Sequence, residues 1–507
     1  MVSEADRSDL PNEFVSDSDT GTTNVGTSAF PGRVPGMLKF IYAVGSAAEV
    51  IISVAFNSFN FFFYTNIMGV PGTLAGLAIT IALIFDAVTD PLVGSLSDRW
   101  RSKWGRRHPF MFAAPIPVML CLFFIYSPPE SFDSFGLFLW LTVLTVIMRS
   151  AMTLYHVPHL ALGAELSADF TERTRVMSIN TLLGAFGGIS MGFIAYSFFF
   201  SATPEYPNGL LNASAYPVLA ISAALSGGAV MVLTTVFTMS VIPRLPRPPA
   251  DLPRFSLSEF LLDCKSAIAN RNYLMLLIGY LLLSATLGTR ETIGLHMNTY
   301  FWELLPEQIR YFLLFAAIAP VVGFVATAPL HDRFEKKPVL IACLVGLLIF
   351  TTAPIVLRIL GWFPENHTSL LLPLLILFST VTACFGVMLL ISAMSALADI
   401  ADEQELTTYR RQEGIFYAAR SFFAKATSGF GHLLAGIAID VIDFPVSAEP
   451  GTVDADKVFN LGLVDGPIAV IPGAIAVFFY LKYNLTRSRH TEIQAELEAR
   501  RVTAQDT

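Results

Sequence analysis

The sequence is poor in charged residues. Asp, Glu, Lys and Arg make up 14% of its 507 residues, whereas soluble domains use roughly 25%. The formal net charge is −8, and the basic residues lie in short, separate segments. Nucleic-acid-binding proteins concentrate such residues in one basic patch, so we expect no nucleic-acid partner.

Cysteine is scarce as well, with four residues and no Cys-x-x-Cys spacing. Cys121, Cys343 and Cys384 fall within apolar runs, and Cys264 falls in a polar segment. Neither a disulfide framework nor a zinc site is indicated. We expect the buried thiols to pack as small hydrophobic side chains.

Two motifs of enzymes and ATPases are also missing. The sequence contains no His-Glu-x-x-His zinc motif and no phosphate-binding P-loop. We therefore expect no enzyme, no cofactor and no built-in ATP hydrolysis. Nothing resembles the selectivity filter of a channel.

Long apolar runs dominate the chain instead. Hydrophobic residues make up 54% of it, and its mean hydropathy is positive. A helix that crosses a bilayer needs about 20 apolar residues. Twelve runs near this length occur, at residues 40–65, 72–97, 109–127, 136–163, 176–201, 217–242, 273–298, 310–330, 338–360, 369–398, 413–442 and 460–483.

These runs predict an all-α membrane protein with about twelve transmembrane helices in two pseudo-symmetric six-helix bundles. Gly105–Arg107 after the second run has a weak counterpart in Lys336 and Lys337 after the eighth, which favours internal duplication and a secondary transporter. The alternative is that short charged loops look alike by chance. The expected parts are a disordered tail (1–38), an N-terminal bundle (39–243), a connector (244–271), a C-terminal bundle (272–484) and a second tail (485–507).

Basic residues gather between the second and third runs, in the connector and after the last run. The positive-inside rule places these segments in the cytoplasm, together with both termini. We expect a multi-pass protein of the bacterial inner membrane. Its expected partners are a small-molecule solute and the lipid bilayer, and we expect it to act as a monomer.

Two carboxylates interrupt the second apolar run. Asp86 and Asp90 are four residues apart, so a helix places both side chains on one face. Ionisable groups at this depth are costly unless they meet a cation, a proton or a partner. The spacing therefore predicts a coupling-ion site. For Asp90 the alternative is a cap before Pro91 at a break in the helix.

The segment around this pair resembles the melibiose-permease family, the glycoside-pentoside-hexuronide cation symporters of the major facilitator superfamily. The resemblance rests on Asp86–Pro91 with Gly94 and on Ser102–Phe110, and it extends over residues 38–484. It implies symport of a sugar or glycoside with Na⁺ or H⁺ by alternating access, in which the two bundles rock around a central cavity.

The resemblance also assigns a cation site to Asp86, Asp90, Thr153 and Lys425. Oxygen ligands suit a hard cation, and a nearby ammonium compensates the carboxylates when the ion leaves. For Lys425 the alternative is an ammonium that extends to the membrane interface. Na⁺ and H⁺ both remain open as the coupling ion.

The substrate side departs from the sugar-transporting pattern. Where sugar carriers of the family have an aspartate on the fourth helix, this chain has His156, and the position of a sugar-binding arginine falls near Asn180 and Thr181. Glu49 approximates an acidic residue of the first helix. The alternative for His156 is a histidine satisfied within helix packing.

The sequence His156–Pro158 is similar to the lysophospholipid-carrying branch of the family. A lysophospholipid-like or other amphipathic solute is therefore the alternative to a sugar. Further candidate contacts are Asn57 and Asn60 in the first apolar run, which also contains Glu49, and Arg149 in the fourth run, which also contains His156. The full set of candidate substrate-binding residues is Glu49, Asn57, Asn60, Arg149, His156, Asn180 and Thr181.

Charged residues at the predicted cytoplasmic ends suggest a gate that closes this side by salt bridges between the bundles. The alternative is a solvated run of charges. The candidate gate residues are Asp98, Arg99, Arg106, Arg107, Asp399, Asp402, Arg410 and Arg411.

Overall fold

The computed structural model describes residues 29–30, 32–245, 256, 258, 262, 265, 267–408 and 413–505, without the side chains of 407–408, 413–418 and 501–505. Most of the predicted first tail and of the connector lies outside these residues, as do Arg410 and Arg411. The described chain is helical, apart from one isolated β-bridge between Phe30 and Ser167.

Within the described ranges, twelve helical spans are long and apolar enough to cross a membrane, and they match the twelve predicted runs. The first half contains α1 (Gly36–Asn57), α2 (Asn60–Phe62), η1 (Phe63–Ile67), α3 (Gly72–Arg99), α4 (His108–Ala113), α5 (Pro115–Ile125), α6 (Ser134–Glu165), α7 (Phe170–Ile194), η2 (Ala195–Phe199), η3 (Gly209–Leu211), α8 (Ala215–Thr238) and η4 (Met239–Arg244).

The second half has the same plan, with short π-helical turns near several helix ends. It contains α10 (Arg271–His296), η5 (Met297–Phe301), α11 (Pro306–Ala316), α12 (Ile318–Phe334), α13 (Lys336–Ile359), α14 (Leu371–Thr408), α15 (Glu413–Ile442), α16 (Ala455–Leu463), η6 (Val464–Ile468), α17 (Ile471–Lys482) and α18 (Arg487–Gln505).

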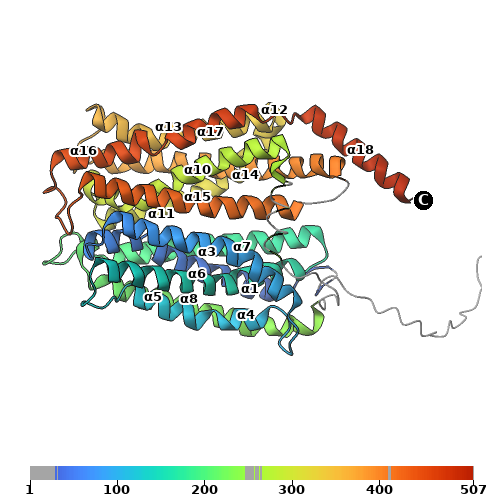
Figure 1. Ribbon diagram of the computed structural model, residues 1–507, viewed down its shortest axis with the longest axis horizontal. Coiled ribbons are helices and arrows are strands. Elements are labelled where there is room, and N and C mark those ends of the chain that lie inside the picture. The colour runs from blue at the N-terminus through green and yellow to red at the C-terminus, as the bar shows by residue number, and fades with distance from the viewer. Residues whose placement is uncertain are drawn as a thin grey trace, which may run out of the picture.

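The two halves lie side by side with their helices along the long axis of the molecule. In Figure 1 the helices α1–α8 occupy the lower part and most of the later helices the upper part. The halves meet chiefly where α3 packs on α15, and also where α7 packs on α11. The expected all-α fold of two six-helix bundles is therefore confirmed.

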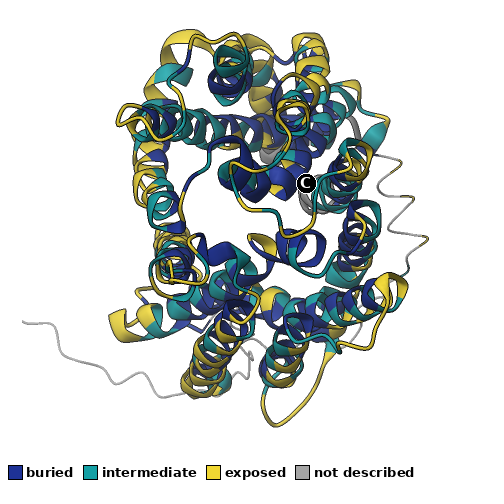
Figure 2. Ribbon diagram, turned by 90° about the vertical axis from the view of Figure 1, so that its left-hand side faces the viewer, coloured by how far each residue is buried: buried dark blue, intermediate teal, exposed yellow. Residues whose placement is uncertain are grey.

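Apolar side chains cover the outside of the bundles, as a bilayer solvent requires. Phe198, Phe324 and Val441 are among the most exposed large hydrophobic residues. Figure 2 shows the buried residues toward the interior, with exposed residues around the perimeter. Inside, small residues allow backbones to approach: a Cβ added to Gly187 of α7 would lie 2.8 Å from the Cα of Ala47 in α1.

The predicted first tail is shorter than expected. The backbone N–H groups of Ala29 and Phe30 donate to the carbonyls of Glu165 (2.8 Å) and Leu166 (3.0 Å), and α1 begins at Gly36. Burial of Ala29 and Val34 accounts for this attachment, because it removes apolar surface from water. After the last span, α18 buries Ile493 and Leu497 and packs on α14.

We call the end of the molecule at which α18 lies the proximal end, and the opposite end the distal end (Figure 1). Polar contacts join the halves at the distal end. Asp440 of α15 accepts hydrogen bonds from the backbone N–H groups of Gly72 (2.6 Å) and Thr73 (2.8 Å). Tyr300 donates to the side-chain oxygen of Asn66 at 2.8 Å. The two halves are therefore closed against each other distally.

The bond to Asp440 also caps a helix. The residue before α3 is Pro71, whose side chain provides no cap. The first N–H groups of a helix lack partners within the helix. A carboxylate from the other half supplies the acceptor here, so the start of α3 depends on contact with α15.

The expected proximal gate is not formed between the halves. Arg106 and Arg107 both bind Glu165, at 2.8 and 2.7 Å, and Arg107 also binds Asp98 at 2.5 Å, all within the first half. Arg107 is 5% exposed, so its charge needs a partner close by in its own bundle. The sequence missed Glu165 as the acceptor, although it follows the last apolar residues of its span.

In the second half, the carboxylates of the predicted gate also pair with basic residues of their own half. Asp399 binds Lys336 at 2.7 Å, and Asp402 binds His490 of α18 at 3.0 Å. Arg99 makes no ion pair with any residue that the structure describes. The prediction that these charges link the two halves is therefore wrong for the described pairs.

We expect Asp440→Ala to loosen the distal closure, because α3 loses its cap from the other half. Loss of a cap costs about 0.5–2 kcal/mol, and each ~1.4 kcal/mol shifts a population roughly tenfold. The reporter is the variant Thr80→Cys. In the parent protein, the Thr80 hydroxyl of α3 donates to the backbone carbonyl of Gly429 in α15, so this position lies at the contact between the halves. Its alkylation rate is measured in purified protein that lacks the native cysteines.

Asp443→Ala is the matched control, because Asp443 is exposed and pairs with Lys457 of the same half at 2.8 Å. Faster alkylation is expected for Asp440→Ala alone. Equal rates in the parent, the control and Asp440→Ala would contradict a role for this bond in distal closure.

Candidate cation and solute site

The carboxylate pair lies in an unbroken helix. Helix α3 continues through Pro91 to Arg99. Pro91 has no N–H, so the carbonyl one turn earlier loses its helical donor, yet the helix does not end. The expectation that Asp90 caps a helix break is therefore wrong, and its side chain is available for other contacts.

A hydroxyl group from α6 lies between the two carboxylates. The Thr153 Oγ1 lies 2.9 Å from Asp86 Oδ1 and 3.0 Å from Asp90 Oδ1. Asp86 and Thr153 are both buried, at 7% and 3% exposed. One hydroxyl has a single proton, so it donates to one carboxylate at a time and leaves acceptor capacity on the other. The result is a compact group of oxygen atoms.

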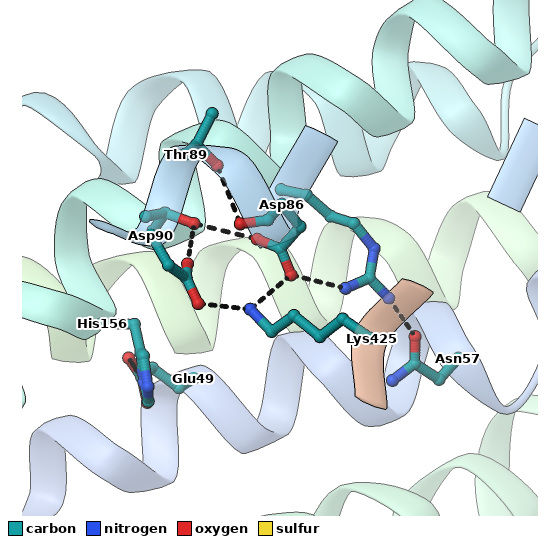
Figure 3. A network of polar contacts seen from close by, with 9 residues as sticks. Glu49, Asn57, Asp86, Thr89, Asp90, His156 and Lys425 are labelled. Carbon is teal, nitrogen blue, oxygen red and sulfur yellow. Dashed lines mark hydrogen bonds and ion pairs between the residues drawn. The ribbon is translucent and has the colours of Figure 1, made fainter. Parts of the chain in front are cut away.

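The second half reaches this group through one side chain. The Lys425 Nζ of α15 lies 2.9 Å from Asp86 Oδ2 and 2.5 Å from Asp90 Oδ2. Figure 3 shows the ammonium directed at both carboxylates. The alternative that Lys425 extends to the membrane interface is therefore wrong.

A second cation contacts the same carboxylate oxygen of Asp86 as Lys425 does. Arg149 Nη1 lies 3.4 Å from Asp86 Oδ2, and its Nη2 donates to the side-chain oxygen of Asn57 at 3.2 Å. The two carboxylates thus face two fixed positive charges, Lys425 and Arg149. Removing one cation from this arrangement would leave a buried carboxylate uncompensated.

Glu49 and His156 form a separate pair beside this network (Figure 3). The His156 Nδ1 lies 3.0 Å from each carboxylate oxygen of Glu49. The histidine side chain is 51% exposed, whereas that of Glu49 is 11% exposed. His156 is therefore not enclosed by helix packing, and it presents part of its ring to open space.

These residues share one cavity of about 230 Å³. It is lined by Glu49, Val50, Ile52, Ser53, Phe56, Asn57, Asp86, Asp90, Met148, Arg149, Met152, Thr153, His156 and Lys425. All four predicted cation-site residues and four of the predicted substrate residues lie on its wall. Sequence reasoning missed its apolar members, because apolar residues in an apolar run carry no distinguishing signal.

Three predicted substrate residues do not line this cavity. Asn60 is buried at 1% exposed, and Asn180 at 9%. The Thr181 hydroxyl donates to the backbone carbonyl of Met177 at 3.0 Å, one turn earlier in α7. None of the three lines this cavity, and their role in solute binding stays a prediction.

The second half holds a buried ion pair that the sequence reasoning also missed. Arg290 of α10 lies 3.1 Å from the Asp465 carboxylate, which is 4% exposed. A signal was present, because Asp465 is an isolated carboxylate within the last apolar run. No group of three or more His, Cys, Asp or Glu residues that could hold a metal ion occurs in the described chain.

Comparison with known proteins shows similarity to membrane transporters. The family model for MFS/sugar transport protein matches residues 41–487. A putative glycoside/cation symporter of Escherichia coli (strain K12) is 24% identical over 90% of this chain and 94% of its own length. A glucuronide carrier protein homolog of the same strain is 23% identical, covering 91% and 95%.

A sodium-dependent lysophosphatidylcholine symporter of Danio rerio is 28% identical, but over only 30% of this chain and 28% of its own length. Among solved structures, the inward-open xylose transporter of E. coli superposes with a TM-score of 0.61 at 12% identity, covering 90% of this chain and 99% of that chain. The fold is therefore that of major facilitator transporters. The chain belongs to the MFS/sugar transport protein family, among the cation symporters that its sequence resembles.

Proposed function

We propose that this protein is a Na⁺-coupled symporter of a sugar or glycoside that works by alternating access. The observation that carries the proposal is the contact of Lys425 with both Asp86 and Asp90 across the two halves. In this role Asp86, Asp90 and Thr153 bind the coupling ion. Glu49, Asn57, Arg149 and His156 contact the solute.

Charge balance explains how an ion would act at this site. Two carboxylates face two fixed cations, so the site is compensated with Lys425 in contact. An added Na⁺ would compete with the ammonium for the same oxygens, because the positive charges repel each other. Binding of the ion therefore requires Lys425 to withdraw, which breaks the contact between the halves.

The solute would be linked to this exchange through the shared cavity. Lys425, Asp90 and His156 all line it. An ion that rearranges Lys425 changes the wall that the solute meets. Coupling of this kind is reciprocal, so a solute that favours the rearranged wall must also tighten ion binding.

Na⁺ is proposed as the ion because its ligands would all be oxygen atoms. Four carboxylate oxygens and the Thr153 hydroxyl converge in a small volume, and hard cations prefer such ligands. A proton would need only one carboxylate. Coupling to H⁺ is the alternative that the first test below decides.

In this proposal the proximal end faces the cytoplasm, because Lys and Arg gather in its loops. The described state is then closed at the end that faces away from the cytoplasm. The protein would act as a monomer in the bacterial inner membrane, with both termini inside.

We expect Asp86→Asn and Asp90→Asn each to abolish Na⁺-driven accumulation, because each amide removes a charge that binds the ion. Uptake of the sugar that best stabilises the purified protein is measured in membrane vesicles with an imposed Na⁺ gradient. Asp454→Asn, an exposed residue of a distal loop, is the control. Undiminished accumulation in either variant would contradict the proposed site, and accumulation driven only by an H⁺ gradient would identify the proton as the ion.

We expect Lys425→Ala to make stability depend on Na⁺. Removing one partner of a buried ion pair costs about 3–5 kcal/mol, so the melting temperature falls without the ion. Added Na⁺ replaces the lost positive charge and restores the melting temperature. The Na⁺ concentration that stabilises the variant should be lower than the concentration that stabilises the parent protein. Lys457→Ala, which removes an exposed ion pair, is the control. If the melting temperature of Lys425→Ala does not change with Na⁺, Lys425 and the ion do not share a site.

A further inference from the structure

A second and larger cavity lies in the C-terminal half. Its volume is about 510 Å³, against about 230 Å³ for the cavity at the carboxylate pair. Ligand pockets for small molecules typically measure roughly 300–1,000 Å³. The first cavity is below this range, and its wall is occupied by charged pairs. The second cavity is therefore large enough to take most of a solute.

Aromatic rings form much of its wall. Trp302, Phe312, Phe350 and Phe378 come from four different segments of the second half and line it together. Flat aromatic faces favour ligands that have an apolar face of their own. The C–H face of a pyranose ring is such a surface, while its hydroxyl groups point outward and need polar partners.

Polar groups for such hydroxyls are present in the same wall. Glu291 is exposed to the cavity and makes no ion pair with any described residue. The Asp465 Oδ1 and the Thr382 Oγ1 are buried without a hydrogen-bond partner. Buried polar atoms of this kind are rare in folded proteins, because each costs free energy unless it is paired. They are suited to accept hydrogen bonds from a ligand.

The charge of the walls selects among possible solutes. The second cavity has two carboxylates, Glu291 and Asp465, and one cation, Arg290. The first cavity has three carboxylates and the two cations Arg149 and Lys425. In the first cavity His156 also pairs with Glu49, so only the second wall has one carboxylate in excess whether or not this histidine is protonated. An anionic solute, such as a uronide, a sulfonate or a phosphate, would meet like charge in the second cavity.

The two cavities lie on facing halves. The first is lined by residues of α1, α3 and α6 together with Lys425 of α15, and the second by residues of the second half. A solute of more than one ring that spans the halves would contact both walls.

We propose that the second cavity is a subsite for the second ring or the aglycone of a neutral glycoside. Glu291, Asp465 and Thr382 accept hydrogen bonds from its hydroxyl groups, and the apolar face of the ring packs against the aromatic wall. The inference rests on the proposed sugar transport and adds the class of sugar: uncharged, and larger than a monosaccharide.

The test is equilibrium binding to the full-length purified protein in Na⁺, measured by calorimetry and by thermal stabilisation. The probes are neutral disaccharides, nitrophenyl glycosides, the parent monosaccharides and the matching nitrophenyl glucuronides. At least one neutral glycoside should bind about tenfold tighter than its monosaccharide and than its glucuronide.

The variants Glu291→Gln and Thr382→Val keep the shape of the wall and remove one acceptor each. Each should weaken binding of that glycoside about tenfold or more, since a hydrogen bond to a polar or charged partner is lost. Monosaccharide binding should be unchanged. Glu365→Gln, an exposed residue outside the cavity, is the matched control.

The outcomes separate the two proposals. If both variants bind the glycoside as the parent does, the subsite is wrong and sugar transport stands. If glucuronides bind as tightly as neutral glycosides, the charge selection is wrong. If no sugar binds in Na⁺, the proposed function fails and the subsite fails with it.

Discussion

The contact between Lys425 and the two carboxylates of α3 is the interaction on which the rest of the arrangement depends. Buried charges are stable only when they are compensated. One oxygen of Asp86 is compensated by two cations, Lys425 at 2.9 Å and Arg149 at 3.4 Å. Because one of these cations belongs to the other half, the electrostatic stability of the first half depends on how the halves are placed. Any ion that replaces Lys425 removes that dependence.

The distal end restricts how the halves can separate. A Cβ added to Gly76 would lie 2.6 Å from the carbonyl oxygen of His432, so the backbones of α3 and α15 touch there. The Thr80 hydroxyl donates to the carbonyl of Gly429 at 2.6 Å in the same seam. The helix pair is therefore tightly packed from its distal end to a point near Asp86. Lys425 lies one helical turn before Gly429, directly beside this close packing.

The sequence predicts the fold and the position of the carboxylate pair on one helix face, because both leave strong local signals. Apolar length predicts the spans, and a spacing of four residues places Asp86 and Asp90 on one helix face. The partner Lys425 is 335 residues from Asp90, so no local pattern identifies it, and only the family resemblance did. The gate prediction failed because a run of charges does not indicate its partners: Arg107 is satisfied by Glu165 within its own bundle.

The histidine at the family's aspartate position need not end sugar recognition. A sugar hydroxyl both donates and accepts, so a site for it needs an acceptor and a donor. Glu49 supplies carboxylate oxygens, and His156, fixed through Nδ1, keeps its other ring nitrogen for the cavity. Because Nδ1 donates to a carboxylate, Nε2 is a second donor only when the ring is protonated. In that form the pair offers a donor and an acceptor where a lone aspartate offers only acceptors, and its two charges cancel. The preference for neutral, hydroxyl-rich solutes then comes from the second cavity, where Glu291 and Asp465 outnumber Arg290.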